Sequence, residues 1–328
     1  MLSETGTVRL FFREAICRAV LEEMQLNPDV MVLGQDVGSF GGAYKEFAGL
    51  YGRFGQERVR DTPVSEAGMI GLAVGAAAAG LRPLVSITYM DFLMLGFDPL
   101  VNYAAKLRYK TGGQLQAPVI IKTTAGAKGQ GVAHSQCIES WLVGVPGLKV
   151  VAPSTPADAY GLMKAAFREK GPVVFVDHKR LFPTAGGVPI QEASVPIGKA
   201  NIARAGRDVT LVSFSYMMRV AMAAAEILLN DDINCEVVDL RSLAPLDMET
   251  LSVSVARTGA LVTLEEGQLT CGIGAEIIAR LQEQFPGLKS TRIGPLAAPV
   301  SSNPVLEAAC LPDAAKVCHA IRTVLQPR

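Results

Sequence analysis

The stretch RDTPVSEAGMIGLAVGAAAAGLRPLVSIT, residues 60–88, carries the strongest structural signal in this chain. Residues 67–81 contain no charge, Gly80 suits a helix C-cap, and Pro83 lies just beyond, a pattern typical of a buried helix. The apolar run 81–88 that follows predicts a buried strand. A helix that leads directly into a buried strand is the repeating unit of a parallel α/β sheet.

The same alternation of helix and strand continues along the first half of the chain. The patterns predict helices over 96–110, 137–145 and 156–170, and strands over 30–34, 117–124, 148–154 and 172–179. Near the N-terminus, a helical apolar pattern begins at residue 8. The predicted strands are nearly continuous apolar runs, which is typical of strands with helices on both faces. The sequence therefore predicts an α/β fold built on a doubly wound parallel sheet.

A second α/β series follows a polar, irregular segment from about residue 183 to residue 206. The patterns in this series predict strands over 208–215, 233–241 and 259–267, and helices over 218–229 and 272–285. A chain of 328 residues is also long for a single domain. We therefore predict an N-terminal domain over 1–185, a linker over 186–205 and a C-terminal domain over 206–328.

The composition argues against several classes of partner. Thirty-one basic and thirty-one acidic residues cancel, so no charge excess indicates binding to nucleic acid or to an anionic membrane. The uncharged run 67–81 is shorter than the roughly 20 residues that span a bilayer. Six cysteines show no CxxC pair and no metal-type spacing, and the N-terminus has no signal-peptide pattern. We expect a cytoplasmic protein with reduced cysteines.

Several common site motifs are absent from the sequence. It contains no GxGxxG fingerprint, no GxxxxGK[ST] phosphate loop and no GxSxG nucleophile elbow. Its three histidines, His134, His178 and His319, are too far apart for a zinc site formed by neighbouring residues. Two polar residues in apolar or glycine-rich surroundings remain as candidates, Glu66 and His134.

Glu66 and His134 each have a structural and a functional interpretation. Together with Asp61 and Ser65, Glu66 could cap the helix that starts there and complement its dipole. His134, in the glycine-rich loop 125–136, could be an ordinary structural histidine. Loops that follow the strands of a doubly wound sheet carry its ligand sites, however, which favours a functional interpretation of both.

Longer motifs, taken in order, resemble one protein family over almost the whole chain. They are DTPVSEAGMIGLAVGAAAAGLRP (61–83), MDF (90–92), FDPLVNYAAKLRY (97–109), GVAHSQ (131–136), PGLKVVAPSTPADAYGLMKAA (146–166) and LEEGQLTCGIGAEI (264–277). The chain resembles the β subunit of thiamine diphosphate-dependent 2-oxo acid dehydrogenases (E1β) and the closely similar acetoin dehydrogenase β subunits. The resemblance implies an N-terminal pyrimidine-binding domain and a C-terminal domain, both of the transketolase type.

The resemblance assigns Glu66 to the cofactor. It implies that this carboxylate hydrogen-bonds N1′ of the aminopyrimidine of thiamine diphosphate, favouring protonation of that nitrogen. The 4′-amino group then shifts toward its imino form, which removes the C2 proton of the thiazolium. Phe92 is implied to pack on the pyrimidine ring, and Val64 and Thr88 to line it.

The resemblance also assigns His134 and a cation site. His134 matches a histidine that faces the reacting carbons and the incoming lipoyl group, a place where an imidazole suits proton transfer near neutral pH. Several relatives hold a structural potassium ion mainly through backbone carbonyl groups. The matching positions here are Val119, Ala166, Phe167, Glu169 and Gly171.

One expected motif is missing. Thiamine enzymes hold the diphosphate through Mg²⁺ with a GDG segment and a later asparagine, and no GDG occurs in this chain. The charge of the diphosphate requires a metal or another cation. The resemblance therefore implies that an E1 α subunit holds Mg²⁺ and the diphosphate, in a heterotetramer of two α and two β subunits. It also implies a lipoyl-bearing E2 acyltransferase as a further partner.

The sequence leaves the reaction open among related activities. The first is decarboxylation of pyruvate or a related 2-oxo acid with transfer of the acyl group to E2. The second is cleavage of acetoin, which the segments YMDF and KLRY favour, and the third is a related carboligase activity. A non-catalytic scaffold subunit is disfavoured because Glu66, Phe92 and His134 are all retained. Gln35 and Asp177 depart from the common family pattern and bear on the substrate rather than on the cofactor.

Overall fold

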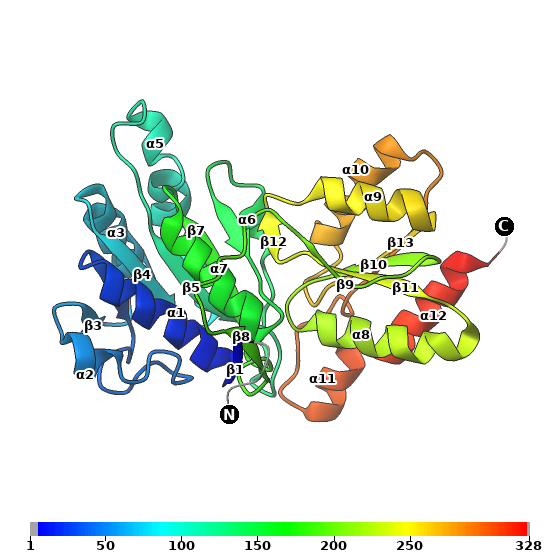
Figure 1. The fold of residues 1–328 in the computed structure, drawn as a ribbon, viewed down its shortest axis with the longest axis horizontal. Coiled ribbons are helices and arrows are strands. Elements are labelled where there is room, and N and C mark those ends of the chain that lie inside the picture. The colour runs from blue at the N-terminus through cyan, green and yellow to red at the C-terminus, as the bar shows by residue number, and fades with distance from the viewer. Residues whose placement is uncertain (1–5, 327–328) are drawn as a thin grey trace. The chain divides into compact units, whose positions relative to one another are not determined.

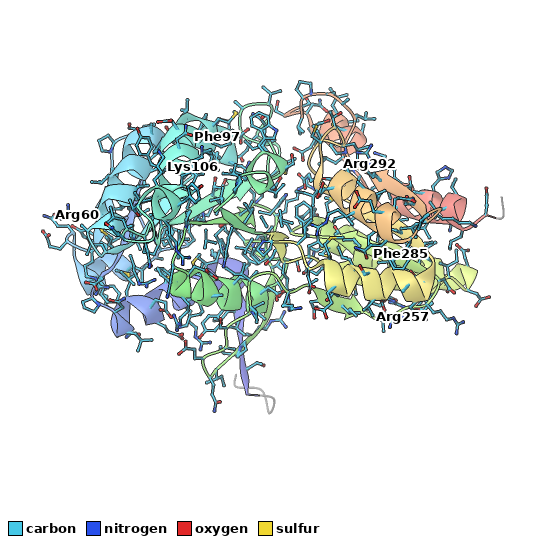
Figure 2. All side chains as sticks on the ribbon, turned by 90° about the horizontal axis from the view of Figure 1, so that it is seen from above. Arg60, Phe97, Lys106, Arg257, Phe285 and Arg292 are labelled. Carbon is cyan, nitrogen blue, oxygen red and sulfur yellow. The ribbon has the colours of Figure 1, made fainter. Side chains whose placement is uncertain are left out.

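The computed structural model describes residues 6–326, which form two compact units. The first unit joins the chain up to Ala125 with Trp141–Ile197, and the second joins Gly126–Ser140 with the chain from Gly198 onward. Each unit is an α/β structure (Figure 1), and side chains fill the space between its sheet and its helices (Figure 2). The segment 126–140, predicted inside the first domain, thus packs with the second unit. The first five and last two residues of the predicted domains lie outside the described residues.

A parallel sheet forms the centre of the first unit. Its strands lie in the order β6-β7-β5-β4-β2-β3, and every neighbouring pair among them is parallel. These strands are β2 (Val30–Gly34), β3 (Val59–Asp61), β4 (Arg82–Ile87), β5 (Ile120–Ala125), β6 (Lys149–Val151) and β7 (Val173–His178). Both β5 and β7 are buried along their whole length, because each has a strand on either side and helices above and below.

Helices cover both faces of this sheet, which confirms the predicted doubly wound fold (Figure 1). Crossovers between parallel strands are right-handed. The β3–β4 connection, which contains α3, and the β6–β7 connection, which contains α7, run in opposite directions along the sheet, so the two helices lie on opposite faces. The helices of this part of the chain are α1 (Phe12–Leu26), α2 (Leu50–Phe54), α3 (Glu66–Ala78), α4 (Met90–Leu93), η1 (Met94–Gly96), η2 (Asp98–Ala104), α5 (Leu107–Lys110), α6 (Ser140–Val143) and α7 (Pro156–Arg168).

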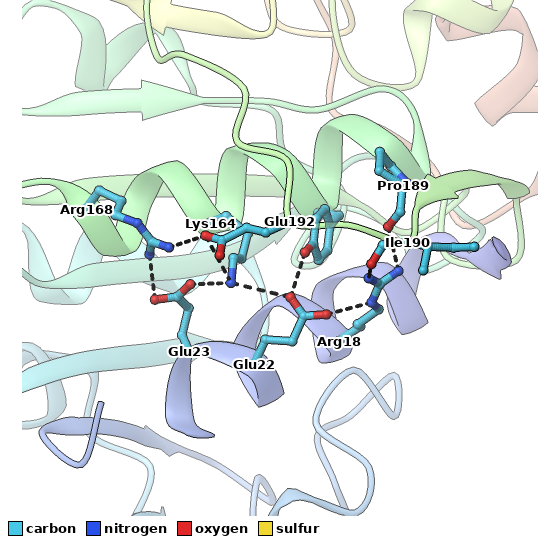
Figure 3. A network of polar contacts seen from close by, with 9 residues as sticks. Arg18, Glu22, Glu23, Lys164, Arg168, Pro189, Ile190 and Glu192 are labelled. Carbon is cyan, nitrogen blue, oxygen red and sulfur yellow. Dashed lines mark hydrogen bonds and ion pairs between the residues drawn. The ribbon is translucent and has the colours of Figure 1, made fainter. Parts of the chain in front are cut away.

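An ion-pair network ties α1 to α7, which lie side by side on one face (Figure 3). The Nζ atom of Lys164, on α7, lies 2.5 Å from Glu23 and 3.4 Å from Glu22, both on α1. Arg168, one turn further along α7, pairs with Glu23 at 2.6 Å. The side chain of Lys164 is buried, and a buried charge is costly unless it is paired. The network therefore fixes the position of α1 against α7.

The second unit contains a smaller mixed sheet. Its strands lie in the order β14-β13-β10-β11-β9, and all neighbours are parallel except β9, which runs antiparallel to β11. The strands of this part of the chain are β9 (Asn201–Arg204), β10 (Val209–Ser213), β11 (Cys235–Asp239), β12 (Ser242–Ala244), β13 (Ala260–Leu264) and β14 (Lys289–Ile293). Its helices are α8 (Met217–Leu228), η3 (Leu229–Asp231), α9 (Met248–Thr258), α10 (Ile273–Gln284), α11 (Pro304–Cys310) and α12 (Ala314–Leu325).

Three local predictions differ from the structure. The helix expected from residue 8 begins at Phe12, because β1 (Thr7–Phe11) pairs antiparallel with β8 (Ala185–Pro189). The predicted linker is not irregular throughout, since β8 lies at one end and β9 at the other. The helix predicted over 96–110 is broken into the end of η1, the π-helix η2 and α5, and Pro99, which lacks an N–H group, lies in the first turn of η2.

Candidate cofactor site

Glu66 is the first residue of α3 and follows the end of β3 by five positions. Ser65 occupies the N-cap position but makes no side-chain cap hydrogen bond, and Asp61 instead accepts the Gly38 amide at 2.7 Å. The capping roles considered for Ser65 and Asp61 are therefore not observed. Glu66 itself lies where a negative charge interacts favourably with the helix dipole.

Glu66 is a buried residue whose side chain has no partner within the described residues. Only 5% of the residue is exposed, and no hydrogen bond or ion pair from residues 6–326 reaches its side chain. A buried carboxylate that lacks a partner is costly, whereas folded proteins normally pair such groups. A protonated ring nitrogen supplied from outside this chain would satisfy it, so the site fits the aminopyrimidine of thiamine diphosphate.

The other residues predicted to contact the pyrimidine lie on the segments that follow β3 and β4. Thr88 directly follows β4, and Phe92 lies on α4, with its ring 6.1 Å from the edge-on ring of Tyr89. The chain then turns at Gly96, whose backbone lies against the carbonyl group of Glu66. Since β3 and β4 both flank β2, their carboxyl ends share one edge of the sheet. Val64, which is 77% exposed, precedes Glu66 at this edge.

His134 lies in the second unit, so its proximity to Glu66 stays a prediction. Its backbone amide donates to the carbonyl oxygen of Gly131 at 3.2 Å, which closes a tight turn, and its side chain is half-buried. Gly131 has φ near +74°, a conformation that favours glycine. A glycine of this loop thus allows the tight turn that ends at His134.

At four of the five positions predicted to hold potassium, the backbone carbonyl already accepts a hydrogen bond within the chain. Arg82 donates from Nη1 to the carbonyl oxygens of Phe167, at 2.7 Å, and Glu169, at 3.3 Å. The carbonyl of Ala166 accepts the Glu169 amide, and that of Val119 accepts the Val173 amide. These carbonyls lie at the end of α7, where a positive charge is favourable, and the guanidinium already supplies it. The potassium site stays a prediction, and Arg82 would compete with the ion for two of its carbonyl ligands.

Sequence reasoning missed a buried charge cluster beneath the sheet edge. Lys122 on β5 is fully buried, with Nζ 2.8 Å from Glu46 and 3.1 Å from Asp177. Burial raises the pKa of Asp177 to about 6 despite the neighbouring ammonium group. Burial lowers the pKa of Lys122, but the charges of Asp177 and Glu46 outweigh it and the pKa is raised overall. Asp177 stands out in the sequence because it departs from the common family pattern. Its partners, Lys122 and Glu46, are distant in the sequence, so no local motif indicates the cluster.

Aromatic rings connect this cluster to Phe92. Tyr44 stacks on Phe182 with centroids 4.6 Å apart and meets Tyr89 edge-on at 6.4 Å. Two buried lysines cover the same rings, Lys122 above Phe182 at 5.4 Å and Lys179 above Tyr89 at 5.0 Å. Phe92 therefore belongs to a layer of packed aromatic rings, and two lysines make cation–π contacts with this layer.

Residues 6–326 contain neither a side-chain cluster suited to a metal ion nor a helix suited to crossing a membrane. No group of three or more histidine, cysteine, aspartate or glutamate side chains is arranged to hold a metal ion. No helix in this range combines the length and the apolar character needed to cross a bilayer.

Comparisons with known proteins first define a class. The model of the transketolase pyrimidine binding domain matches residues 9–184, and that of the transketolase C-terminal domain matches residues 198–317. A solved structure titled split gene transketolase, inactive beta4 tetramer, has a TM-score of 0.79 and 24% identity. The match covers 96% of this chain and 97% of that one. Fold and domain matches thus define a two-domain protein of the transketolase type.

Sequence relatives narrow this class to one family. The pyruvate dehydrogenase E1 component subunit beta of Rhizobium meliloti (strain 1021) is 43% identical over 327 residues, covering 98% of this chain and 71% of the relative. The mitochondrial subunit beta-1 of Arabidopsis thaliana is 45% identical over 286 residues, covering 85% of this chain and 78% of the relative. The acetoin:2,6-dichlorophenolindophenol oxidoreductase subunit beta of Cupriavidus necator is 39% identical over 332 residues. This match covers 97% of this chain and 98% of the relative. The chain belongs to the family of thiamine diphosphate-dependent E1 β subunits and their acetoin-oxidising relatives.

Proposed function

We propose that this chain is the β subunit of a thiamine diphosphate-dependent enzyme that decarboxylates pyruvate or a related 2-oxo acid. In this proposal the acyl group passes to the lipoyl group of an E2 acyltransferase. The observation that carries the proposal is the position of Glu66 at the sheet edge, beside the segment that bears Phe92: the residue is buried and makes no hydrogen bond or ion pair with residues 6–326. Buried polar side chains are normally paired, so this position of Glu66 favours a ligand from outside the chain.

Each predicted residue has a defined task in this reaction. When bound, thiamine diphosphate supplies the carbon nucleophile and the electron sink for decarboxylation. Glu66 holds a proton on N1′ of the pyrimidine, and the uncharged surface of α3 keeps water away from that contact. Phe92 orients the ring by packing on its face. His134 moves a proton at the acceptor during acyl transfer.

The open face of α3 supports an α subunit as the partner that completes the site. Its exposed positions include Gly71 and Gly75, and no atom comes within 4 Å of where a Cβ would stand at either one. Leu72 and Leu95, near Glu66, are 58% and 64% exposed. An uncharged, glycine-lined helix face bordered by exposed leucines suits close packing of another chain. We propose that this partner is an α subunit, which also holds Mg²⁺ and the diphosphate, in a heterotetramer of two α and two β subunits.

Acetoin cleavage is the second candidate, and one observation favours it. The acetoin-oxidising relative matches this chain over 98% of its own length, whereas the Rhizobium relative matches over 71%. The higher identity to the pyruvate dehydrogenase subunits, 43% and 45% against 39%, favours the 2-oxo acid reaction. We propose the cytoplasm as the compartment, because none of the six cysteines forms a disulfide bond in the described part of the chain, as in reducing surroundings.

Co-expression with the neighbouring α gene tests the proposal. Isothermal titration should show tight thiamine diphosphate binding with Mg²⁺ to the heterotetramer and weak binding to this chain alone. Dye-linked assays of the heterotetramer with pyruvate, branched 2-oxo acids and acetoin should then show activity with a 2-oxo acid. A marked preference for acetoin would support the second candidate. Tight cofactor binding and turnover by this chain alone would contradict the proposed division of the site.

A further inference from the structure

The loop that carries His134, residues 126–140, is attached to the second unit by glutamate side chains. The backbone amide of Ala127 donates to Oε1 of Glu266 at 2.8 Å. The backbone amide of Gly129 donates to Oε2 of Glu307 at 2.6 Å. Hydrogen bonds from an amide to a carboxylate are among the stronger ones in proteins. Two of the loop's backbone positions, on the N-terminal side of His134, are therefore held by acceptors from outside the loop.

Both acceptors are themselves held in place. Glu307 lies on α11 and is only 6% exposed, and its helix is capped by Asn303, whose side chain accepts the amides of Val305 and Leu306. Glu266 follows β13, next to Glu265. Glu265 accepts the amides of Ile273 and Gly274 at 3.0 Å each and so links this segment to the start of α10. The loop is thus tied to rigid parts of the second unit.

The other end of the loop is fixed by close packing. Gly267 lies against the carbonyl oxygen of Cys137, so that a Cβ on Gly267 would stand 3.2 Å from it. The same Cβ would stand 3.6 Å from the carboxylate of Glu265 and 3.9 Å from that of Glu139. Glu139, which ends the loop, is 3% exposed. His134 therefore sits between two anchored ends.

The side of the loop between these ends faces a cavity rather than a packed core. The cavity has a volume of about 560 Å³, and its walls are Val132, Ser135, Gln136, Cys137, Ile138, Glu266, Gln268, Pro295, Ala297, Ala298, Pro299 and Val300. Ser135, next to His134, is 3% exposed, and within the described residues its hydroxyl has no hydrogen-bond partner. The cavity leaves apolar packing incomplete on this side of the loop. The hydrogen bonds to Glu266 and Glu307 therefore contribute much of what fixes the position of the loop.

We infer that Glu266 and Glu307 are positioning residues for His134. They accept backbone amides of the loop, contact neither cofactor nor substrate in this role, and act by narrowing the range of positions that the imidazole can adopt. The inference rests on the proposed function for the task that His134 performs, while the contacts that hold the loop do not depend on it.

The test compares Glu266→Ala and Glu307→Ala with matched variants in the heterotetramer. Glu266→Gln and Glu307→Gln remove the charge but keep a carbonyl oxygen that accepts the amide, so they should restore most of the wild-type behaviour. Glu283→Ala, on the exposed face of α10, removes a carboxylate that does not contact the loop and serves as the control.

Hydrogen exchange measures the hold on the loop directly. Each alanine variant should speed amide exchange within residues 126–134 by about tenfold, because a charge-assisted hydrogen bond is lost. The glutamine variants should show about threefold or less, and Glu283→Ala should show no change in these amides. Unchanged exchange of the loop in both alanine variants would overturn the inference.

Acyl transfer measures the consequence for His134. Glu266→Ala should lower kcat for transfer to a lipoyl domain by about tenfold while KM for the 2-oxo acid stays within about twofold. Adding Glu266→Ala to His134→Ala should cause no further loss, because both changes remove the same function. A multiplicative loss in the double variant would contradict the inference. If His134→Ala alone transfers acyl groups normally while the alanine variants still loosen the loop, the proposed function of His134 fails and the positioning contacts stand.

Discussion

Gly96 lies against the carbonyl oxygen of Glu66, so closely that a Cβ on Gly96 would stand 3.2 Å from that oxygen. The same Cβ would stand 2.5 Å from Cδ1 of Ile70. This contact joins the segment that carries Phe92 to the first turn of α3. The two parts of the predicted pyrimidine site therefore depend on each other through one glycine.

Replacing Gly96 with alanine should disturb the cofactor site before it disturbs the fold. The side chain of Ile70 can rotate away, but the backbone of Glu66 must shift, which costs about 1–3 kcal/mol. Titration of the heterotetramer should show an affinity for thiamine diphosphate weakened by about tenfold. Gly52→Ala, on α2 where no atom lies within 4 Å, is the control and should leave affinity unchanged. Equal affinity in both variants would show that the contact does not position Glu66.

Arg82 should make the stability of this chain independent of potassium. Its guanidinium donates to the carbonyls of Phe167 and Glu169 at the end of α7, where a bound cation would act. The melting temperature in KCl and in NaCl should therefore agree within about 1 °C. Arg82→Met removes the charge-assisted hydrogen bonds and should lower stability by about 1.5–3 kcal/mol. A wild-type protein stabilised by several degrees in KCl would contradict this prediction and support the predicted potassium site.

Lys122→Met should be strongly destabilising. The change leaves Glu46 and Asp177 buried without their shared ammonium partner, a situation that costs about 3–5 kcal/mol. Chemical denaturation at pH 7 measures the loss. The triple variant with Glu46→Gln and Asp177→Asn removes the two charges and should recover part of it. A loss below about 1 kcal/mol in Lys122→Met would mean that the cluster contributes little to the fold.

Glu139 should make the chain less stable as pH rises. Burial raises its pKa from 4.5 to about 8, and the charges of Glu266 and Glu265 add to the effect. Between these two values the folded chain holds a proton that the unfolded chain has released, so stability falls by about 1.4 kcal/mol per pH unit at most. Glu139→Gln stays neutral and should be more stable than wild type at pH 9. Denaturation at pH 6 and 9 tests this, and an identical pH dependence in both proteins would contradict it.

Local sequence patterns predicted the sheet and the residues near its edge because they depend on neighbouring positions. The uncharged run after Glu66 specifies α3, and the apolar run at 81–88 specifies β4. The contacts that the sequence could not show join distant positions. Lys122 meets Glu46 across 76 residues, Arg82 meets Phe167 across 85, and Glu307 meets Gly129 across 178. No periodicity encodes such pairs, since they depend on which elements become neighbours after folding.

The strand β1 shows the same limit at the level of secondary structure. Residues 7–11 fit the start of an apolar helical pattern, but their register with β8 decides the outcome. Pairing with a strand that lies about 180 residues later outweighs a local preference for helix.

The central claim is that Glu66 activates the cofactor. The most direct measurement is the rate at which the C2 hydrogen of bound thiamine diphosphate exchanges with deuterium in the heterotetramer, followed by quenched-flow NMR. Glu66→Gln keeps the size of the side chain but cannot hold a proton on N1′, so exchange should slow by about a hundredfold or more while cofactor affinity changes little. An exchange rate in Glu66→Gln equal to that of the wild type would contradict the account.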